Sequence, residues 1–479
     1  MSHRIAAERK GNIVGRQKRS KHLRIDESFW VWLESPTTPM HVAALATFET
    51  DGEPAAEVVR RILADFRKRT DVDPRFRTVI RMRRFPRRAR RALVDDIDLD
   101  FHLRHHTLSA AGGESELAQL VSQLRSSRFD TRRPMWQVHV IEGLSGNRFA
   151  VYLAAHHALI NGVDAVRLLS RSLATDGGAP VATPVWTIGR PRPTDIEARR
   201  ATKSRPNPAR ALFAAAKAVG TLFLAWRTNA PLTGPFTAPR SRLNVDIGPR
   251  RRVCTASIDL NRIKDLSKAS GASPNDIVLA ACSTALRRYL LDIGGLPDKP
   301  LIAGCPVSIA APEGSNADSS IGIMFADLAT DQPDPAARLT TISRSTTAAK
   351  NHQAALPHAA PLPYSILAMA PHTIRQLTPG AVERLAPAFN LIVSNVPGPS
   401  QPRYLAGARM AGLYPLSLLF KGEALNITAV SYAGRMHLGF TACPTALPEV
   451  QLLARYIDDA VDELEDRYAT AIPDLPKPA

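Results

Sequence analysis

Cysteine is scarce in this sequence, and no two cysteines have the spacing of a metal-binding pair. The 479 residues contain four cysteines, at Cys254, Cys282, Cys305 and Cys443. A structural zinc site needs closely spaced Cys and His ligands, and a disulfide framework is typical of short secreted chains with regularly spaced cysteines. We therefore expect four free thiols in a reducing compartment, with neither a structural metal nor disulfide bonds.

Long apolar runs are missing as well. No window reaches the ~20 uninterrupted apolar residues that a membrane-spanning helix needs. The nearest stretch, 208–226, is interrupted by Arg210, Lys217 and Gly220, and it suits either a helix on a membrane surface or an internal helix. The N-terminal residues lack the apolar segment of a secretory signal, so we expect a cytoplasmic protein that is not secreted.

Acidic residues are outnumbered by basic ones. The chain has 44 Asp and Glu against 62 Lys and Arg, a formal net charge of +18, with basic clusters at 15–24 and 75–91. This excess favours an anionic partner, which would be nucleic acid, an acidic membrane or a phosphate-bearing substrate, although a solvated basic face is the plainer interpretation. No nucleic-acid-binding module is recognisable, so nucleic acid is the weakest of the three.

The length and composition predict two globular domains. Apolar residues make up 44% of the chain and charged residues 22%, which allows a sizeable core and argues against global disorder. Between 176 and 208 the composition shifts to Gly, Pro, Thr and Arg, as in a linker. The predicted parts are a basic tail, an N-terminal domain, a linker with a connecting helix, a C-terminal domain and a second tail: 1–24, 25–180, 181–245, 246–470 and 471–479.

Both predicted domains alternate helical and extended patterns. Helical periodicity is found in the segments 53–69, 114–129, 163–174, 273–294 and 448–469. Extended patterns are found at 136–144, 148–157, 251–260, 300–309, 321–330, 389–399, 424–434 and 435–443. Ser273 is the expected N-cap of the helix that Pro274 begins. The fold class is therefore α/β (α+β), with a mixed sheet and flanking helices in each domain.

The stretch "HHALING", residues 156–162, places two adjacent histidines at the end of a buried strand and just before a helix. Neighbouring strand residues point to opposite faces, so the pair cannot easily bind one metal ion. A satisfied structural histidine explains one of the two. A histidine at a strand end can instead present its imidazole to a cleft between domains and act as a general base.

Two further patterns limit the chemistry. The sequence has no GxSxG nucleophile elbow, which leaves a base acting directly on a bound hydroxyl group. A second pair, His105–His106, is predicted to lie in a polar loop, and we assign it no chemistry.

The "HHALING" stretch resembles the HHxxxDG motif of CoA-dependent acyltransferases, and the likeness continues along the chain. The wax ester synthase/diacylglycerol acyltransferase family of actinobacteria is the most similar branch. Segment 25–49 is similar to the N-terminal signature of that family, 133–144 to its Pro-Leu-Trp block, and 273–290 to the block that contains its Asn-Asp pair. Its C-terminal blocks are similar to the segments 390–399, 404–417 and 425–440. Two acyltransferase-like domains with the active site at their interface are what this resemblance implies.

The resemblance also implies roles for individual residues. His157 would take the proton of an acceptor hydroxyl, whose oxygen then attacks the thioester of acyl-CoA, with no bound cofactor. His156, Asn161 and Gly162 would support the motif. Candidate cleft-lining residues are Asn275, Asp276, Pro397 and Gly398.

Asn161 departs from the family pattern, which has Asp at this position. In the family, the carboxylate of that Asp is thought to hold the loop through an arginine. The predicted function is acyl transfer from long-chain acyl-CoA to diacylglycerol, or to a long-chain alcohol to give a wax ester. The alternative is a weak or silent paralogue that binds lipid. Lipid substrates predict a peripheral location on the inner membrane or lipid droplets. The 75–91 segment would then bind either CoA phosphates or anionic lipid.

Overall fold

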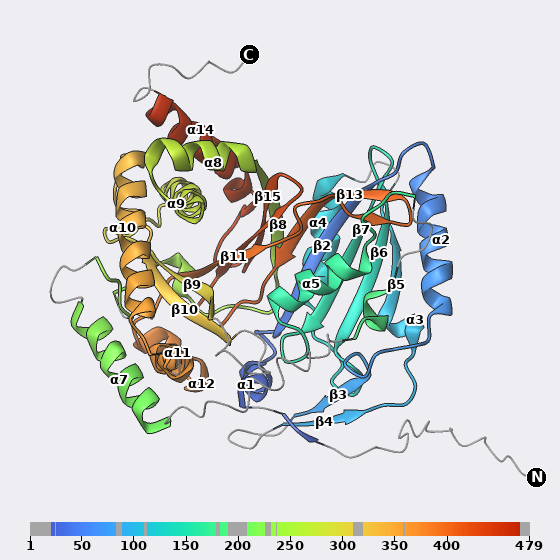
Figure 1. Ribbon diagram of the computed structural model, residues 1–479, viewed down its shortest axis with the longest axis horizontal. Helices are drawn as coiled ribbons and strands as arrows, with labels where there is room; N and C mark the ends of the chain where they lie inside the picture. The colour runs from blue at the N-terminus through green and yellow to red at the C-terminus, as the bar shows by residue number, and fades with distance from the viewer. Residues whose placement is uncertain are drawn as a thin grey trace, which may run out of the picture.

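The computed structural model describes residues 21–23, 25–82, 89–109, 113–178, 183–189, 208–225, 231–235, 237–309, 320–357 and 360–469. Most of the two predicted tails, the centre of the Arg-rich segment and part of the predicted linker lie outside these residues. Figure 1 shows two sheets side by side, each with its own helices, and this arrangement confirms the predicted α/β class.

The first six-stranded sheet belongs mainly to the N-terminal half. Its strands, in spatial order, are β12 (Tyr404–Leu405), β13 (Ala408–Leu416), β2 (His41–Glu49), β7 (Arg148–His156), β6 (Trp136–Leu144) and β5 (Leu103–Thr107). All neighbouring strands are antiparallel except β5 and β6, which are parallel. The predicted β6–β7 hairpin turns at 145–147, where Gly146 and Asn147 have positive φ.

The second six-stranded sheet belongs entirely to the C-terminal half. Its order is β10 (Ser320–Asp327), β9 (Ile302–Ile309), β11 (Leu391–Pro397), β14 (Leu425–Tyr432), β15 (Arg435–Ala442) and β8 (Arg252–Asp259). The central strand β11 runs parallel to both of its neighbours. A small third sheet joins β1 (Lys21–His22), β4 (Arg90–Leu93) and β3 (Thr78–Arg81).

One segment of the predicted C-terminal domain lies in the other sheet. Strands β12 and β13, residues 404–416, extend the N-terminal sheet, where β13 pairs with β2 from Arg409 to Leu416. The apolar side chains of Met410 and Leu413 are buried there with residues of β2 and β7. The two halves are therefore joined by a crossover as well as by the linker.

Helices pack on both sheets, and two of them, α1 and α4, also contact the other half of the molecule. In the N-terminal half they are α1 (Ile25–Leu33), α2 (Ala55–Lys68), α3 (Leu99–His102), α4 (Glu114–Ser126) and α5 (Gly162–Ser172). In the C-terminal half they are α7 (Pro208–Ala225), α8 (Leu260–Ser270), α9 (Pro274–Asp292), α10 (Pro335–Ala354), α11 (Pro361–Ala368), α12 (Ala370–Leu377), α13 (Ala381–Arg384) and α14 (Gln451–Ala469). Short 3-10 turns occupy Val185–Thr187 and Arg242–Asn244. Within the described ranges, no helix has the length and apolarity needed to cross a bilayer.

The apolar cores explain how the helices are held. Helices α2 and α5 pack on one face of the N-terminal sheet and α4 on the other. Helix α9 is buried along most of its length between the C-terminal sheet and helices α8, α10 and α14, and Ser273 caps it as predicted. The interpretation of His105–His106 as a polar loop is wrong, because both residues lie on strand β5 and pair with β6.

Candidate active site

The "HHALING" stretch lies at the end of strand β7. This strand is in the middle of its sheet, between β2 and β6. The chain turns immediately after the strand, with the amide of Leu159 donating to the carbonyl of His156 at 2.8 Å. Helix α5 then begins at Gly162, in the space between the two halves of the molecule (Figure 1). The strand end, turn and helix match the local structure predicted from the sequence.

His156 points into the protein and is 1% exposed. Its Nδ1 accepts the backbone N–H of Ala158 at 3.1 Å, and its Nε2 lies 3.4 Å from Oε2 of Glu34. That separation is long for a hydrogen bond, but neither atom has a better partner among the described residues. Glu34, just after α1, also lies 3.5 Å from Nε of Arg128. These contacts therefore hold His156 inside the protein.

His157 leaves the strand and turns its ring toward α1. Its backbone N–H donates to the carbonyl of Met40 at 2.8 Å, and its imidazole stacks on the indole of Trp30 with centroids 3.8 Å apart. Nδ1 is buried and has no hydrogen-bond partner among the described residues, which leaves Nε2 as the nitrogen that can meet a substrate. The residue as a whole keeps partial exposure.

The surroundings of His157 determine its protonation. Burial, followed by the charge of His156, lowers its pKa to about 3. The ring is therefore neutral near pH 7 and able to accept a proton. Around it lies an apolar cluster drawn from both halves, in which Leu33, Met40 and Trp30 pack with Leu418 and Phe420.

Asn161 is the N-cap of helix α5. Its side-chain oxygen accepts the backbone N–H of Asp164 at 2.8 Å, so its partner is a backbone amide instead of an arginine. Gly162 follows as the first helical residue, and a Cβ at this position would meet nothing within 4 Å. The protein around Gly162 therefore does not itself require glycine.

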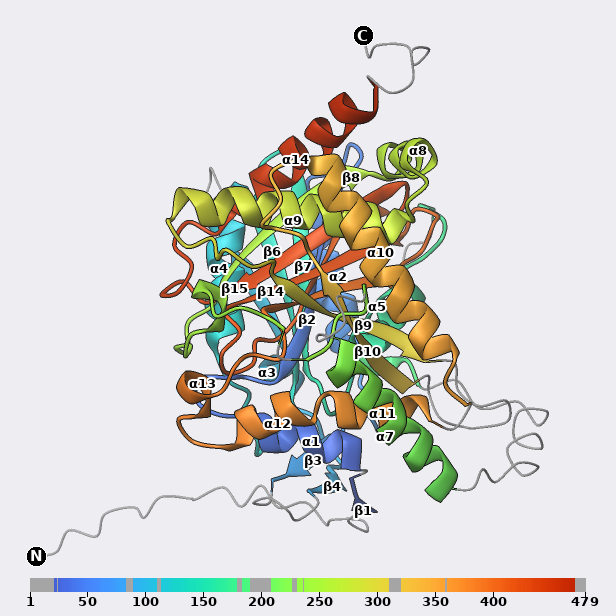
Figure 2. The ribbon, with the colours of Figure 1, turned by 90° about the vertical axis from the view of Figure 1, so that its left-hand side faces the viewer.

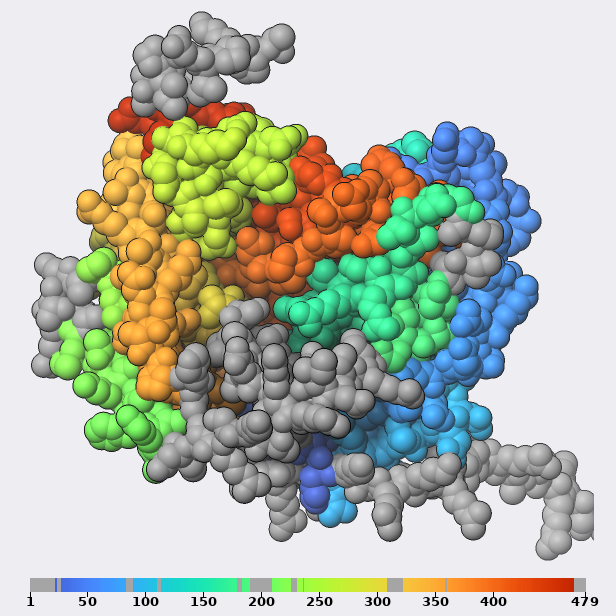
Figure 3. Space-filling view, in the orientation of Figure 1, coloured from blue at the N-terminus to red at the C-terminus, as the bar shows by residue number. Residues whose placement is uncertain are grey.

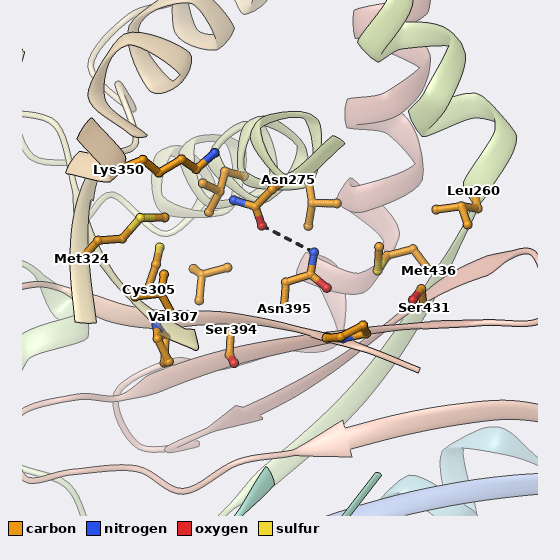
Figure 4. A pocket seen from close by; sticks show the side chains of 15 residues that line it. Leu260, Asn275, Cys305, Val307, Met324, Lys350, Ser394, Asn395, Ser431 and Met436 are labelled. Atoms are coloured by element: carbon orange, nitrogen blue, oxygen red, sulfur yellow. Dashed lines mark hydrogen bonds between the residues drawn. The ribbon is translucent and has the colours of Figure 1, made fainter. Parts of the chain in front are cut away.

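A cavity of about 430 Å³ lies in the C-terminal half, between the N-terminal end of α9 and the strands β9, β10 and β11. Asn275 and Pro397 line it, as do Asn395 and Lys350. Figure 4 shows the Lys350 amine beside Asn275, whose oxygen accepts from Nδ2 of Asn395 at 3.4 Å. The other walls are mostly apolar. His157 is not among the lining residues, so the cavity and the histidine pair are two separate parts of the candidate site.

Two of the predicted cleft-lining residues do not line this cavity. Asp276 is buried, and its carboxylate accepts from the backbone and hydroxyl of Ser273 and from the hydroxyl of Thr346 at 2.7–3.0 Å. It therefore braces the start of α9 against α10. Gly398 lies against β14, where a Cβ would come within 2.3 Å of the carbonyl oxygen of Ser431. Its glycine is needed for that close backbone approach.

The sequence interpretation missed Trp30, Glu34 and Lys350. Trp30 and Glu34 were inside a recognised signature, and their four-residue spacing on a helix could have placed them on one face. Nothing in the sequence relates Lys350 to the cavity, because α10 meets β10 only in the folded chain. Among the described residues, no group of three or more His, Cys, Asp and Glu is arranged to hold a metal ion.

Comparison with known proteins gives consistent matches over most of the chain. The model of the wax ester synthase/diacylglycerol acyltransferase catalytic domain matches residues 23–278, and the model of the WS/DGAT C-terminal domain matches residues 319–465. A Mycobacterium tuberculosis protein with the name "Probable diacyglycerol O-acyltransferase tgs2" is 38% identical, covering 92% of this chain and 98% of its own. The O-acyltransferase WSD of Acinetobacter baylyi is 32% identical, covering 90% and 94%.

Solved structures agree with the sequence matches. The wax ester synthase/diacylglycerol acyltransferase of Marinobacter aquaeolei VT8 superposes with a TM-score of 0.74 at 30% identity, covering 94% of this chain and all of the other. The first condensation domain of the calcium-dependent antibiotic synthetase has a TM-score of 0.55 at 16% identity, covering 95% and 97%. That second likeness concerns the fold alone.

Proposed function

The chain belongs to the wax ester synthase/diacylglycerol acyltransferase family and is an O-acyltransferase, and from this premise we propose its substrates and its base. The acyl donor is a long-chain acyl-CoA, which enters as a co-substrate. The acceptor is diacylglycerol, which gives triacylglycerol, with a long-chain alcohol as the alternative acceptor. His157 is the general base, and the observation that carries this proposal is the position of its ring just after the end of β7, stacked on Trp30, in a residue that keeps partial exposure.

The reaction needs one proton acceptor and no covalent enzyme intermediate. Nε2 of His157 takes the proton of the acceptor hydroxyl as the oxygen attacks the thioester carbonyl. The tetrahedral intermediate then collapses, the carbon–sulfur bond breaks, and the CoA thiolate takes the proton back from the imidazolium. A pKa of about 3 makes the neutral base fully available at neutral pH, and it makes the imidazolium a strong proton donor to the leaving thiolate.

The cavity of the C-terminal half suits part of the acyl donor. Its walls are largely apolar, the paired amides of Asn275 and Asn395 can bind the amide groups of a pantetheine arm, and the Lys350 amine can bind phosphate. Lys350 has no ion-pair partner among the described residues. The described parts of the 75–91 segment contribute nothing to the lining of this cavity.

A radiometric assay with labelled palmitoyl-CoA and diolein tests the reaction. We expect triacylglycerol from the wild type and a loss of at least ~100-fold in His157→Ala, since general base catalysis contributes about 10²–10⁴-fold. Retention of activity in a folded His157→Ala variant would exclude this residue as the base. Offering a long-chain alcohol in parallel measures the preference between the two acceptors.

A lipid surface is the proposed location of the enzyme, and one face of the molecule suits it. Most of the large apolar side chains that remain exposed among the described residues lie on or beside α7, α11 and α12, including Phe213 at 74% and Ile366 at 62%. The others on these helices are Leu212, Phe223, Leu224, Leu362, Ile374 and Leu377, and exposed Leu385 follows α13 (Ala381–Arg384). Helices α7, α11 and α12 lie together at one end of the molecule (Figure 2). An exposed apolar area of this kind marks an interaction site.

The charge of these segments favours an anionic lipid surface over a protein partner. The sequence has no Asp or Glu between residues 198 and 245 or between 335 and 382, and α7 carries Arg210 and Lys217 beside its exposed apolar side chains, whereas Arg375 of α12 is buried. Basic residues beside exposed apolar side chains on helices are the pattern of an interfacial anchor. The inner side of α12 also contacts the active-site wall, because His372 packs against Phe420. A docked enzyme would thus receive lipid acceptors near His157.

Vesicle co-sedimentation tests this location separately from catalysis. We expect the enzyme to bind phosphatidylcholine vesicles that contain phosphatidylglycerol, to bind less in high salt, and to lose binding when Phe213 and Ile366 are both replaced by Ser. Leu291→Ser is the matched control, because Leu291 is also exposed but lies on α9, at the other end of the molecule (Figure 2). Equal binding by the double variant and the control would exclude this face.

A further inference from the structure

The motif histidines are held from one side by a single helix. Trp30 lies on α1, and Glu34 follows four residues later, just beyond the end of the helix. Because residues four apart lie on the same face of a helix, the indole and the carboxylate point in the same direction. Trp30 contacts the ring of His157, and Glu34 contacts the ring of His156.

The contacts of His156 determine which of its nitrogens carries the proton. The backbone N–H of Ala158 donates to Nδ1, so Nδ1 has no proton of its own. In the neutral ring the proton is then on Nε2, which faces Oε2 of Glu34. The carboxylate thus favours the one tautomer that can accept the amide of Ala158. That amide belongs to the turn immediately after His157, so the direction of the turn depends on this contact.

The carboxylate of Glu34 is ionised although its side chain is only 1% exposed. Burial alone would raise its pKa, but the hydrogen-bonding and charge interactions with His156 and Arg128 outweigh burial and lower the pKa below its ordinary value. An ionised, buried carboxylate is expensive to keep, and its two oxygens have different partners: Nε of Arg128 donates to Oε1 at 3.5 Å, and Nε2 of His156 lies 3.4 Å from Oε2.

We infer that Glu34 is a positioning residue for acyl transfer, which acts through His156 and the turn at Ala158 to aim the imidazole of His157. Trp30 also helps to position the imidazole of His157, because it fixes the plane of the ring and covers one of its faces. Neither residue accepts the substrate proton. This inference rests on the proposed role of His157 as the base.

The length and the charge of residue 34 can be separated with two substitutions. Glu34→Gln keeps the reach and an acceptor oxygen for Nε2 of His156 but removes the charge. Glu34→Asp keeps the charge but withdraws the oxygens by one methylene. Small misplacements of a catalytic group lower rates by as much as ~100-fold, so we expect kcat to fall about 10-fold or more in Glu34→Asp and less than about 3-fold in Glu34→Gln, with both KM values nearly unchanged.

A purely structural role would give the opposite order. If Glu34 served only as the ion-pair partner of Arg128, Glu34→Asp would keep more activity than Glu34→Gln, and kcat would follow the melting temperature; either result would overturn the inference. Glu27→Gln and Glu27→Asp are matched controls on the same helix, where Glu27 pairs with Arg91, and we expect neither to change kcat. An active His157→Ala variant would instead refute the proposed base, whatever the order at residue 34.

Discussion

At the scale of single residues, the substitution that raised doubt about activity has a simple structural explanation. Asn161 caps α5 through an oxygen that accepts a backbone amide, and Asn and Asp are about equally good at this task. The start of α5 is therefore capped without a carboxylate at residue 161. The departure from the family pattern does not by itself argue for a silent paralogue.

Substitutions at residue 161 should separate capping from charge. We expect Asn161→Asp to keep wild-type kcat within about 3-fold and to be as stable or slightly more stable, because a negative charge at a helix N-terminus adds about 0.3–1 kcal/mol. Asn161→Ala should lower the free energy of unfolding by about 1 kcal/mol. Urea denaturation and steady-state kinetics measure both quantities. A large gain of kcat in Asn161→Asp would mean that the carboxylate has a direct role in catalysis.

The pKa of His157 predicts an unusual pH profile. An ordinary histidine would lose its ability to accept a proton as the pH falls through about 6.5. Burial lowers the pKa of His157 to about 3, so log kcat/KM should stay level from pH 8 down to the pH at which the protein begins to unfold. Initial rates between pH 5.5 and 8.5, with folding followed by circular dichroism, provide the check. A decline centred near pH 6.5 in a folded enzyme would show that the ring is solvated.

At the scale of elements, the two residues of the Asn-Asp pair at the start of α9 have different roles. Asn275 faces the cavity, whereas Asp276 accepts hydrogen bonds from Ser273 and Thr346. Asn275→Ala should therefore raise the KM for acyl-CoA with little change in stability. Asp276→Ala should lower the free energy of unfolding by about 1–3 kcal/mol, because buried donors then lose their acceptor. The kcat of the folded variant should stay close to that of the wild type. The reverse pattern would place Asp276 at the substrate.

The elements also show what the sequence can and cannot predict. The periodicity of 53–69 and the Ser-Pro start of α9 are local signals, and the helices form where these signals predict them. Strand β13 has an ordinary extended pattern, but nothing in it indicates that its partner is β2, more than 350 residues earlier. The contact of Glu34 with His156 is hidden for the same reason, since it depends on how α1 docks beside β7.

At the scale of the whole molecule, buried histidines link stability to pH. Burial is the main reason that the pKa falls to about 4 for His102 and His437 and to about 3 for His139 and His372. In the unfolded chain these groups titrate near 6.5, so below that pH the unfolded state binds protons that the native state does not. Stability is therefore present in full above pH 6.5 and is lost as the pH falls toward the folded values.

Two buried carboxyl groups act in the opposite direction. Burial raises the pKa of Asp327 to about 6 and that of Glu423 well above its ordinary value, so the native state holds protons there that the unfolded chain releases. These four histidines, together with His157 and with His41, whose pKa burial also lowers, outnumber the two carboxyls, so the net effect between pH 6 and 5 is a loss of stability of ~1.4 kcal/mol per pH unit for each histidine that no carboxyl offsets. Ion-paired acids such as Asp98 and Asp130, whose pKa values are lowered, add to this loss only below that window.

Urea denaturation at pH 7.5, 6.5, 6.0, 5.5 and 5.0 measures this slope directly. We expect the unfolding free energy to be flat at the two highest values and to fall steeply below them, with proton uptake on unfolding. Replacing His437 by Gln removes one titrating group and should reduce the slope by ~1.4 kcal/mol per pH unit, whatever it does to stability at pH 7.5. A flat curve down to pH 5 would mean that these histidines are hydrated, and that the sheets do not exclude water around them as the burial of their side chains implies. The surface of this face is hollowed by a notch between the two halves (Figure 3).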